Sequence, residues 1–120
     1  MPNAIRIHEQ GGPEVMRWES VDLPELGSEE IRIRHTAIGL NFIDTYQRSG
    51  LYPLNPPCGL GKEAAGVVEE VGSAVKEFKK GDRVVYVSGT SAYSEVSQIA
   101  SNLVVPIPDD VEDEVAAASM

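Results

Sequence analysis

A glycine-rich run in the middle of the chain has the composition of a phosphate-binding loop. It spans residues 59–66 and contains Lys62 followed directly by Glu63. A P-loop needs Ser or Thr after its lysine, and a dinucleotide-binding turn must lie between a strand and a helix. Here the run lies between a proline-rich segment and a predicted strand. The pattern therefore predicts tight backbone turns that lead into a strand, and not a phosphate site.

The chain offers few residues for nucleophilic or metal chemistry. Cys58 is the single cysteine, which excludes an internal disulfide and a Cys-rich zinc site. It follows two prolines in a predicted loop, and no histidine lies near it in sequence to activate the thiol. His8 and His35 fall in predicted strands, where solvated or packed side chains are a better interpretation than a ligand pair. We therefore predict no catalytic residue and no metal-binding residue among these groups.

The charge and hydropathy of the chain argue against two classes of partner. Its 120 residues suit one domain and carry 10 Lys and Arg against 19 Asp and Glu, a net charge of -9. Such a surface repels phosphate backbones, so no nucleic acid partner is expected. No apolar run approaches the ~20 residues of a membrane-spanning helix, and the first residues lack the layout of a signal peptide. We expect a cytoplasmic protein with no membrane partner.

Alternation with a period of two dominates the sequence and predicts strands. The clearest case is the segment around Ile31 and Ile33, which should face a core while Arg32 and Arg34 face water. Strands are predicted at residues 4–8, 15–19, 30–39, 66–71, 84–87, 92–96 and 103–105. Short strands at this spacing predict a barrel or two packed sheets, in a fold that is mainly β with short helices (α+β).

Two segments break the alternation and predict helices. Residues 41–50 have Asn41 as an N-cap, Asp44 at the third helical position and Gly50 as a C-terminal stop. Residues 109–118 have an Asp cap, an acidic first turn and an alanine run, but no stop signal before Met120. We therefore expect this chain to be part of a larger protein whose second helix continues further.

Six motifs in register carry a family resemblance. The pattern Gly61-x-Glu63-x-x-Gly66-x5-Gly72-x2-Val75 resembles an element of the medium-chain dehydrogenase/reductase superfamily. The other motifs, in the same order as in that superfamily, are Gly11-Gly12-Pro13-Glu14-Val15, Asn41-Phe42-Ile43-Asp44, Arg48-Ser49-Gly50-Leu51-Tyr52-Pro53, Gly81-Asp82-Arg83-Val84 and Ala92-Tyr93-Ser94-Glu95. Over essentially the whole chain, the combination resembles the zeta-crystallin-like NADPH:quinone oxidoreductases.

The resemblance implies a fold and a domain organisation. Residues 1–108 would form a GroES-like catalytic or substrate domain, which is a distorted β-barrel. Residues 109–120 would begin the helix that leads to a Rossmann cofactor domain, and that domain is absent from these 120 residues. Family members usually pair through the cofactor domain, so a homodimer of the full-length protein is left open.

Departures from the wider superfamily predict a member without zinc. Zinc alcohol dehydrogenases have Cys where Asn41 stands and His where Lys62 stands, and neither an amide nor an ammonium suits Zn²⁺ at these positions. They also insert a lobe with four cysteines after the element that matches residues 81–84, whereas this chain continues directly into the next predicted strand.

The resemblance also implies which residues form the site. Asn41 is expected to hydrogen-bond the cofactor or a quinone oxygen, or simply to cap the helix, and it can do both. The expected residues at the nicotinamide end of NADPH are Asn41, Phe42, Ile43 and Asp44, and those at the substrate are Asn41, Tyr46 and Tyr52. The alternative for the two tyrosines is a packing role in the core. Asp44 should support the helix start rather than transfer protons, and Glu63 should be structural.

The predicted function is reduction of quinones or related conjugated carbonyls by NADPH in the full-length protein, with the isolated chain inactive. One alternative is a GroES-like binding module without catalytic activity. A co-chaperonin would show a Gly-rich mobile loop with an exposed apolar triplet, and residues 41–53 do not have that composition. A structural, crystallin-like role would be an added use of the same protein. The choice of NADPH over NADH and the natural substrate are left open.

Overall fold

The structure is a computed structural model that describes residues 2–50, 56, 58–87, 89 and 91–119. Its elements in chain order are β1 (Asn3–Ile7), β2 (Met16–Ser20), β3 (Glu30–Ile38), α1 (Phe42–Ser49), β4 (Cys58–Gly59), β5 (Ala64–Val71), β6 (Arg83–Tyr86), β7 (Val96–Ala100), β8 (Val104–Pro106) and α2 (Asp113–Ser119), with short 3-10 turns at Pro13–Val15 and Ser101–Leu103. The prediction of a mainly β chain with short helices is confirmed. Neither helix in the described part is long and apolar enough to span a membrane.

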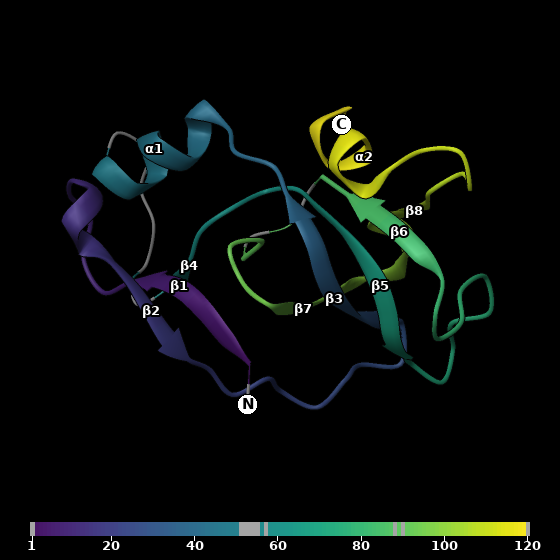
Figure 1. Cartoon of the computed structure of the whole chain (residues 1–120). Coiled ribbons are helices and arrows are strands. Elements are labelled where there is room, and N and C mark those ends of the chain that lie inside the picture. Colours follow the sequence, from purple (N-terminus) through teal and green to yellow (C-terminus); the bar gives the residue numbers. More distant parts are fainter. Residues whose placement is uncertain (1, 51–55, 57, 88, 90, 120) are drawn as a thin grey trace.

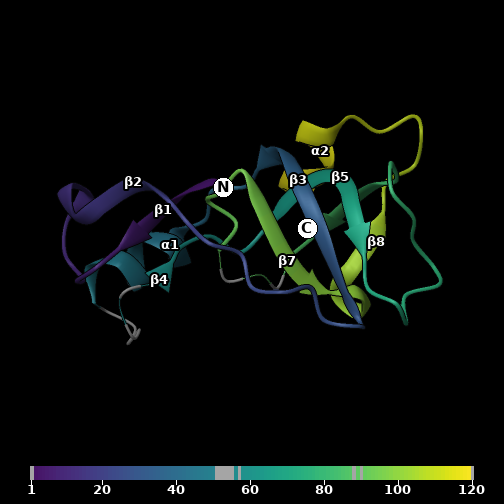
Figure 2. The same ribbon diagram turned by 90° about the horizontal axis from the view of Figure 1, so that it is seen from below.

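Two antiparallel sheets lie at opposite ends of an elongated molecule of 40 × 31 × 21 Å (Figures 1 and 2). The smaller sheet has the strand order β2-β1-β4, and α1 lies beside it. The larger sheet has the order β7-β3-β5-β6-β8, curls into a half-barrel and is covered at one end by α2. The two helices therefore lie on either side of the segment that leaves β3, and this segment forms the candidate site.

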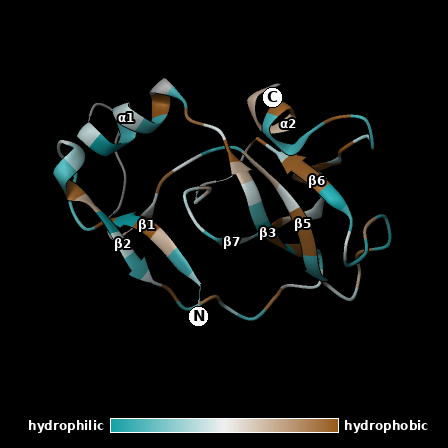
Figure 3. Ribbon diagram, in the orientation of Figure 1, coloured by the Kyte–Doolittle hydropathy of each residue, from teal (hydrophilic) through white to brown (hydrophobic). Residues whose placement is uncertain are grey.

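The larger sheet carries most of the core, as the alternation in sequence predicts. Ile31 and Ile33 on β3 are fully buried, whereas the side chain of Arg34 is mostly exposed. The two isoleucines pack with buried residues of β5, β6, β7 and β8 into one apolar cluster. In Figure 3, β5 and β6 each carry a hydrophobic stretch, while α1 is largely hydrophilic. Burial of these apolar side chains stabilises the larger sheet.

One edge of β3 is left open near its end. β3 pairs with β5 as far as Ile38, but its pairing with β7 stops at Arg34 and Val96. The reason is that residues 92–95 turn away to the smaller sheet, where Ser94 forms a bridge with Ala4. The predicted strand at 92–96 is therefore wrong, since β7 spans Val96–Ala100. The alternating burial of residues 92, 94 and 96 comes from a segment that passes between two sheets, and not from a regular strand.

Several other boundaries differ from the sequence prediction. Cys58 lies in the short strand β4, opposite Ile7, and not in a loop. β5 begins two residues before the predicted start, at Ala64, and His8 directly follows β1 instead of ending it. In the glycine-rich run, where tight turns are predicted, the structure has a bend at Lys62, and Gly61 has a positive φ of 102°. A strand as short as β4 depends on its partner strand, so local pattern has little power to predict it.

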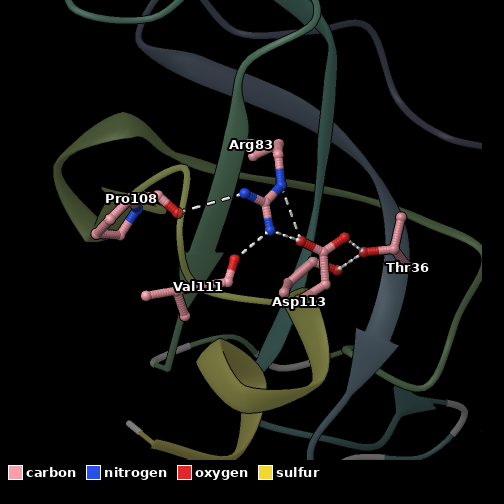
Figure 4. Close-up of polar contacts among 6 residues, drawn as sticks. Thr36, Arg83, Pro108, Val111 and Asp113 are labelled. Atoms are coloured by element: carbon pink, nitrogen blue, oxygen red, sulfur yellow. Dashed lines mark hydrogen bonds and ion pairs between the residues drawn. The ribbon is translucent and has the colours of Figure 1, made fainter.

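The second helix starts later than predicted because a tertiary contact holds the segment before it. Residues 109–112 form turn and coil, and α2 begins at Asp113. Arg83 on β6 donates to the carbonyl oxygens of Pro108 and Val111 and to Asp113 Oδ1, while the Thr36 hydroxyl donates to Asp113 Oδ2 (Figure 4). Because Arg83 occupies these carbonyls, the acidic segment after Pro108 is unwound and Asp113 becomes the first residue of the helix.

Asp113 gives the fold a dependence on pH that can be measured. The hydrogen bond from Thr36, together with Arg83, holds the pKa of Asp113 below its ordinary value of 3.8. Stabilisation is then complete above that value and is lost as the pH falls through the lower pKa of the folded state. We expect Asp113→Asn to lower the free energy of unfolding by about 1 kcal/mol near neutral pH, and by less as the pH falls below about 3.

Urea unfolding of the wild type and of Asp113→Asn, at neutral pH and again at acidic pH, measures this difference in the free energy of unfolding. Asp110→Asn is the matched control, because Asp110 is exposed in the preceding turn. If Asp110→Asn changes the free energy of unfolding as much as Asp113→Asn, the contact with Arg83 and Thr36 does not hold α2.

Candidate functional site

The end of β3, the start of α1 and one face of α2 enclose a pocket of about 450 Å³. Three segments contribute to it: residues 36–41, Glu63 just before β5, and Glu114, Ala117 and Ala118 of α2. The sequence brings these together because β3 and β5 are adjacent antiparallel strands, so the end of one lies beside the start of the other. The pocket is of the size of small-molecule sites, which range from about 300 to 1,000 Å³.

Asn41 and Glu63 form a hydrogen-bonded polar pair in this pocket. The Asn41 side chain donates from Nδ2 to Glu63 Oε1 at 3.2 Å. Glu63 is 6% exposed, and none of the ion pairs found among the described residues involves it. Gly39 makes room for the carboxylate, because a Cβ built at residue 39 would lie 2.1 Å from Glu63 Oε1. The pocket thus contains a buried carboxylate and an amide that is oriented by it.

Asp44 acts behind Asn41, at the start of α1. Its Oδ2 accepts from the backbone N–H of Asn41 at 3.1 Å and from the hydroxyl of Tyr93 at 2.5 Å. The Asn41 side chain completes a capping box with the Asp44 N–H, although that N–H also bonds to the Asn41 carbonyl oxygen at 3.0 Å. Asp44 is 2% exposed. Burial and the bond to Asp44 both raise the pKa of Tyr93, so its hydroxyl stays a donor at neutral pH.

A second pocket, of about 520 Å³, lies along the open edge of β3. Its lining is largely apolar and includes Trp18 of β2, Ile38 of β3 and Leu40, which are 60%, 43% and 79% exposed. Single exposed apolar side chains are ordinary, but several that line one hollow form a patch of the kind that marks an interaction or ligand site. The two pockets share residues 36–40, so the segment that leaves β3 has a polar pocket on the side of α2 and an apolar one on the side of β2.

The two histidines lie far apart in the fold, His8 directly after β1 and His35 on β3, and they have separate partners. His8 bonds to Glu19 of β2 at the surface. His35 Nδ1 donates to the Ser94 carbonyl oxygen at 2.7 Å, so its Nε2 accepts from the Tyr86 hydroxyl at 2.8 Å. Burial lowers the pKa of His35 and raises the pKa of Tyr86 to about 12, so both are neutral near pH 7. Ser97 of β7 also bonds to His35 and Tyr86, so this cluster joins β3, β6 and β7 and works as a buried polar contact of the core.

The structure brings together some of the predicted site residues. Asn41 lines the polar pocket and Asp44 lies behind it, whereas Ile43 and Tyr46 are each 39% exposed on α1 and line neither of the pockets above. Phe42 lies in α1, but its side chain is outside the described part, and Tyr52 lies outside the described residues altogether. Sequence reasoning missed the contacts of Glu63 and Tyr93, which lie 22 and 49 residues from their partners.

The family model of the alcohol dehydrogenase GroES-like domain matches residues 27–109, from the turn before β3 to the segment before α2. The chain belongs to this family. The GroES-like fold predicted from the motifs is thereby confirmed, and the polar pocket lies within or directly beside the matched residues. The side of the pocket that α2 forms lies outside the residues that the family model matches.

Curated relatives are similar over the whole chain. A quinone oxidoreductase of Pseudomonas aeruginosa is 51% identical over 122 residues, which cover 100% of this chain and 38% of the relative. Quinone oxidoreductase 1 of Escherichia coli is 48% identical over 99% of this chain and 37% of its own length. A 2-haloacrylate reductase of a Burkholderia species is 40% identical over 100% of this chain and 38% of its own length. The chain therefore spans somewhat over a third of the length of these relatives.

Solved structures agree with this relation. The quinone oxidoreductase of Escherichia coli, solved in complex with NADPH, superposes with a TM-score of 0.95 at 47% identity, over 98% of this chain and 37% of that chain. The quinone oxidoreductase of Pseudomonas syringae superposes with a TM-score of 0.94 at 48% identity, over 98% and 37%. The resemblance to the N-terminal portion of quinone oxidoreductases, predicted from six motifs, is confirmed.

Proposed function

We propose that this chain supplies the substrate-binding portion of an NADPH-dependent reductase of quinones or related conjugated carbonyls. The observation that carries the proposal is the 51% identity to a quinone oxidoreductase along the whole chain. The polar pocket at Asn41 and Glu63 supports it, because it combines small-molecule size with a directed hydrogen-bond donor. Since the chain spans 38% of that relative, the activity is proposed for a longer protein that contains it.

The names of two relatives state substrates that share one chemical feature. A quinone and a 2-haloacrylate each have a carbon–carbon double bond conjugated to a carbonyl or carboxyl group. Reduction of such a system places negative charge on the oxygen as the hydride arrives, so a hydrogen-bond donor at that oxygen lowers the barrier. We assign this role to the Asn41 side chain, which lines the pocket and carries two N–H groups on Nδ2.

The other predicted site residues have supporting roles in this proposal. NADPH supplies the hydride when it is bound. Phe42 and Ile43 would border its nicotinamide end, and Asp44 would hold the first turn of α1 in place from its buried position. Tyr46 and Tyr52 as planar contacts of a quinone stay a prediction. We assign proton transfer to none of these residues, since Asp44 is buried behind Asn41 and lines neither of the pockets above.

The described residues fit only part of a dinucleotide. The polar pocket can take one ring-sized group, but none of the strand–turn–helix units among the described residues has the glycine-rich turn that binds a pyrophosphate. We therefore propose that the residues that hold most of NADPH lie in a second domain, to which residues 109–120 lead. The 120-residue chain alone is then expected to bind NADPH weakly and to have no reductase activity.

The donor groups at the pocket do not suit the zinc ion of alcohol dehydrogenases. Asn41 turns its nitrogen end toward Glu63, and the residues that line the pocket include neither His nor Cys. A catalytic zinc needs three protein ligands, and among the described residues no three His, Cys, Asp or Glu side chains lie close enough together to hold a metal ion. Zn²⁺ prefers thiolate, imidazole and carboxylate ligands. We therefore propose that the reaction needs no zinc, and no step above depends on a metal.

The test is NADPH oxidation by the full-length protein and by this chain, with a quinone, an enone and a simple ketone as acceptors. We expect turnover of the quinone or the enone by the full-length protein, no turnover of the ketone, no loss of rate with EDTA, and no activity of the 120-residue chain. A full-length protein that reduces only the ketone, or that loses its rate with EDTA, would contradict the proposal. Absence of any turnover would favour the binding-module alternative.

A further inference from the structure

Glu63 is a buried carboxylate that the proposed function leaves without a role. It lies in the wall of the polar pocket with 6% of its surface exposed, and it accepts a hydrogen bond from Asn41. Two features of the chain maintain this contact. A Cβ at residue 39 would overlap the Glu63 carboxylate, and glycine has none. The Gly39 N–H also donates to the Glu63 backbone carbonyl oxygen at 3.0 Å. The backbone that follows β3 is therefore shaped around this one side chain.

The hydrogen bond to Glu63 determines the orientation of the Asn41 side-chain amide. A carboxylate only accepts hydrogen bonds, so the end of the amide that meets Glu63 must be the nitrogen. The oxygen end then lies on the side of the Asp44 N–H, where it completes the capping box. Both neighbours favour the same orientation. One hydrogen of Nδ2 bonds to Glu63, and among the described residues nothing else bonds to Nδ2, so its second hydrogen remains for a ligand.

We propose that Glu63 is a positioning residue, which orients the Asn41 amide so that the site presents an N–H and selects ligands with a carbonyl oxygen. This inference deepens the proposed function and rests on it for the identity of the substrate class. A quinone or enone oxygen accepts this N–H, whereas a hydroxyl that must donate would have to reach the amide oxygen, which faces the start of the helix. Without the Glu63 carboxylate, the Asn41 amide could rotate so that its nitrogen and oxygen exchange places. The preference for ligands with a carbonyl oxygen would then be lost.

A donor–acceptor exchange separates this role from a structural one. The double variant combines Asn41→Asp with Glu63→Gln, so the introduced glutamine donates to the introduced aspartate. The aspartate still caps α1, and the net charge is unchanged. A purely structural pair would work equally well when reversed. The positioning role would not, because the side chain at position 41 no longer has an N–H for the ligand.

We expect the full-length double variant to keep a melting temperature near that of wild type, with kcat/KM for a quinone at least about tenfold lower, as expected for one lost hydrogen bond in the transition state. The KM for NADPH should change little. The kcat/KM of the single variant Glu63→Gln should lie between those of wild type and the double variant, because a glutamine amide can present either its nitrogen or its oxygen to Asn41. A double variant that reduces the quinone as well as wild type overturns the proposal.

A second measurement does not depend on turnover. In ¹H–¹⁵N spectra of the 120-residue chain, the side-chain signals of Asn41 are identified by their loss in Asn41→Asp. We expect Glu63→Gln to shift these signals, and Glu69→Gln to leave them unchanged, since Glu69 pairs with Arg34 at the surface. Unchanged Asn41 signals in Glu63→Gln would overturn the positioning role even if the enzyme reduces quinones. Shifted signals with no quinone turnover by the full-length wild type would instead reject the proposed function.

Discussion

Replacement of Gly66 by alanine is expected to unfold most of the protein. A Cβ at residue 66 would lie 2.2 Å from the carbonyl oxygen of Arg34 and 2.7 Å from Cγ2 of Ile33. The first of these atoms is backbone, so relief requires β3 and β5 to separate at the centre of the larger sheet, where His35 pairs with Gly66. We expect the free energy of unfolding to fall by at least about 3 kcal/mol, a large share of the stability of a small domain.

Urea unfolding followed by circular dichroism measures this loss. Gly81→Ala is the matched control, because Gly81 has a positive φ of 96° but nothing within 4 Å of a Cβ. Only backbone strain then opposes the substitution, at about 1 kcal/mol. If Gly66→Ala and Gly81→Ala lower the free energy of unfolding equally, β5 does not approach β3 closely at residue 66.

Replacement of Asp44 by alanine is expected to have the second-largest effect, confined to α1 and the polar pocket. The substitution leaves the Asn41 N–H and the Tyr93 hydroxyl without their acceptor, in a position that is 2% exposed, and it removes the acidic half of the capping box. One lost cap and one partly buried donor left unpaired together lower the free energy of unfolding by about 3 kcal/mol. In the full-length protein, the displaced Asn41 should also weaken substrate binding.

Hydrogen exchange of the backbone amides of residues 41–45 locates this change, and urea unfolding measures its size. Tyr93→Phe is the matched variant, since it removes one donor to the same carboxylate and keeps the capping box. We expect it to lower the free energy of unfolding by about 1 kcal/mol. If exchange at residues 41–45 is unchanged in Asp44→Ala, the carboxylate does not hold the helix start.

Local pattern was sufficient where burial or a cap depends on neighbours in sequence. The alternation of Ile31 and Ile33 with Arg32 and Arg34 predicts β3 and its buried face, and both are confirmed. The cap at Asn41 and the stop at Gly50 predict α1, which runs from Phe42 to Ser49 with Gly50 in the left-handed conformation. These features involve interactions within a few residues, so one sequence contains all the information they need.

Boundaries set by another part of the chain were beyond local pattern. The start of α2 depends on Arg83, 30 residues before Asp113, and the course of residues 92–95 depends on the smaller sheet. In both cases the local sequence favours a regular element, and a tertiary contact changes where it begins. The acidic turn is still present but stays exposed, and the alternating apolar residues pack between the two sheets.

The sequence by itself determined the family, through six motifs in register, and with it the GroES-like fold and the place of Asn41 at a helix start. Only the tertiary structure decided what surrounds Asn41. It set Glu63 on one side of the amide and Tyr93 behind Asp44, and it closed the pocket with α2. The physical reason is that a cap is a contact between near neighbours, whereas the direction of a side-chain amide depends on partners that only the pairing of β3 with β5 brings within hydrogen-bond distance.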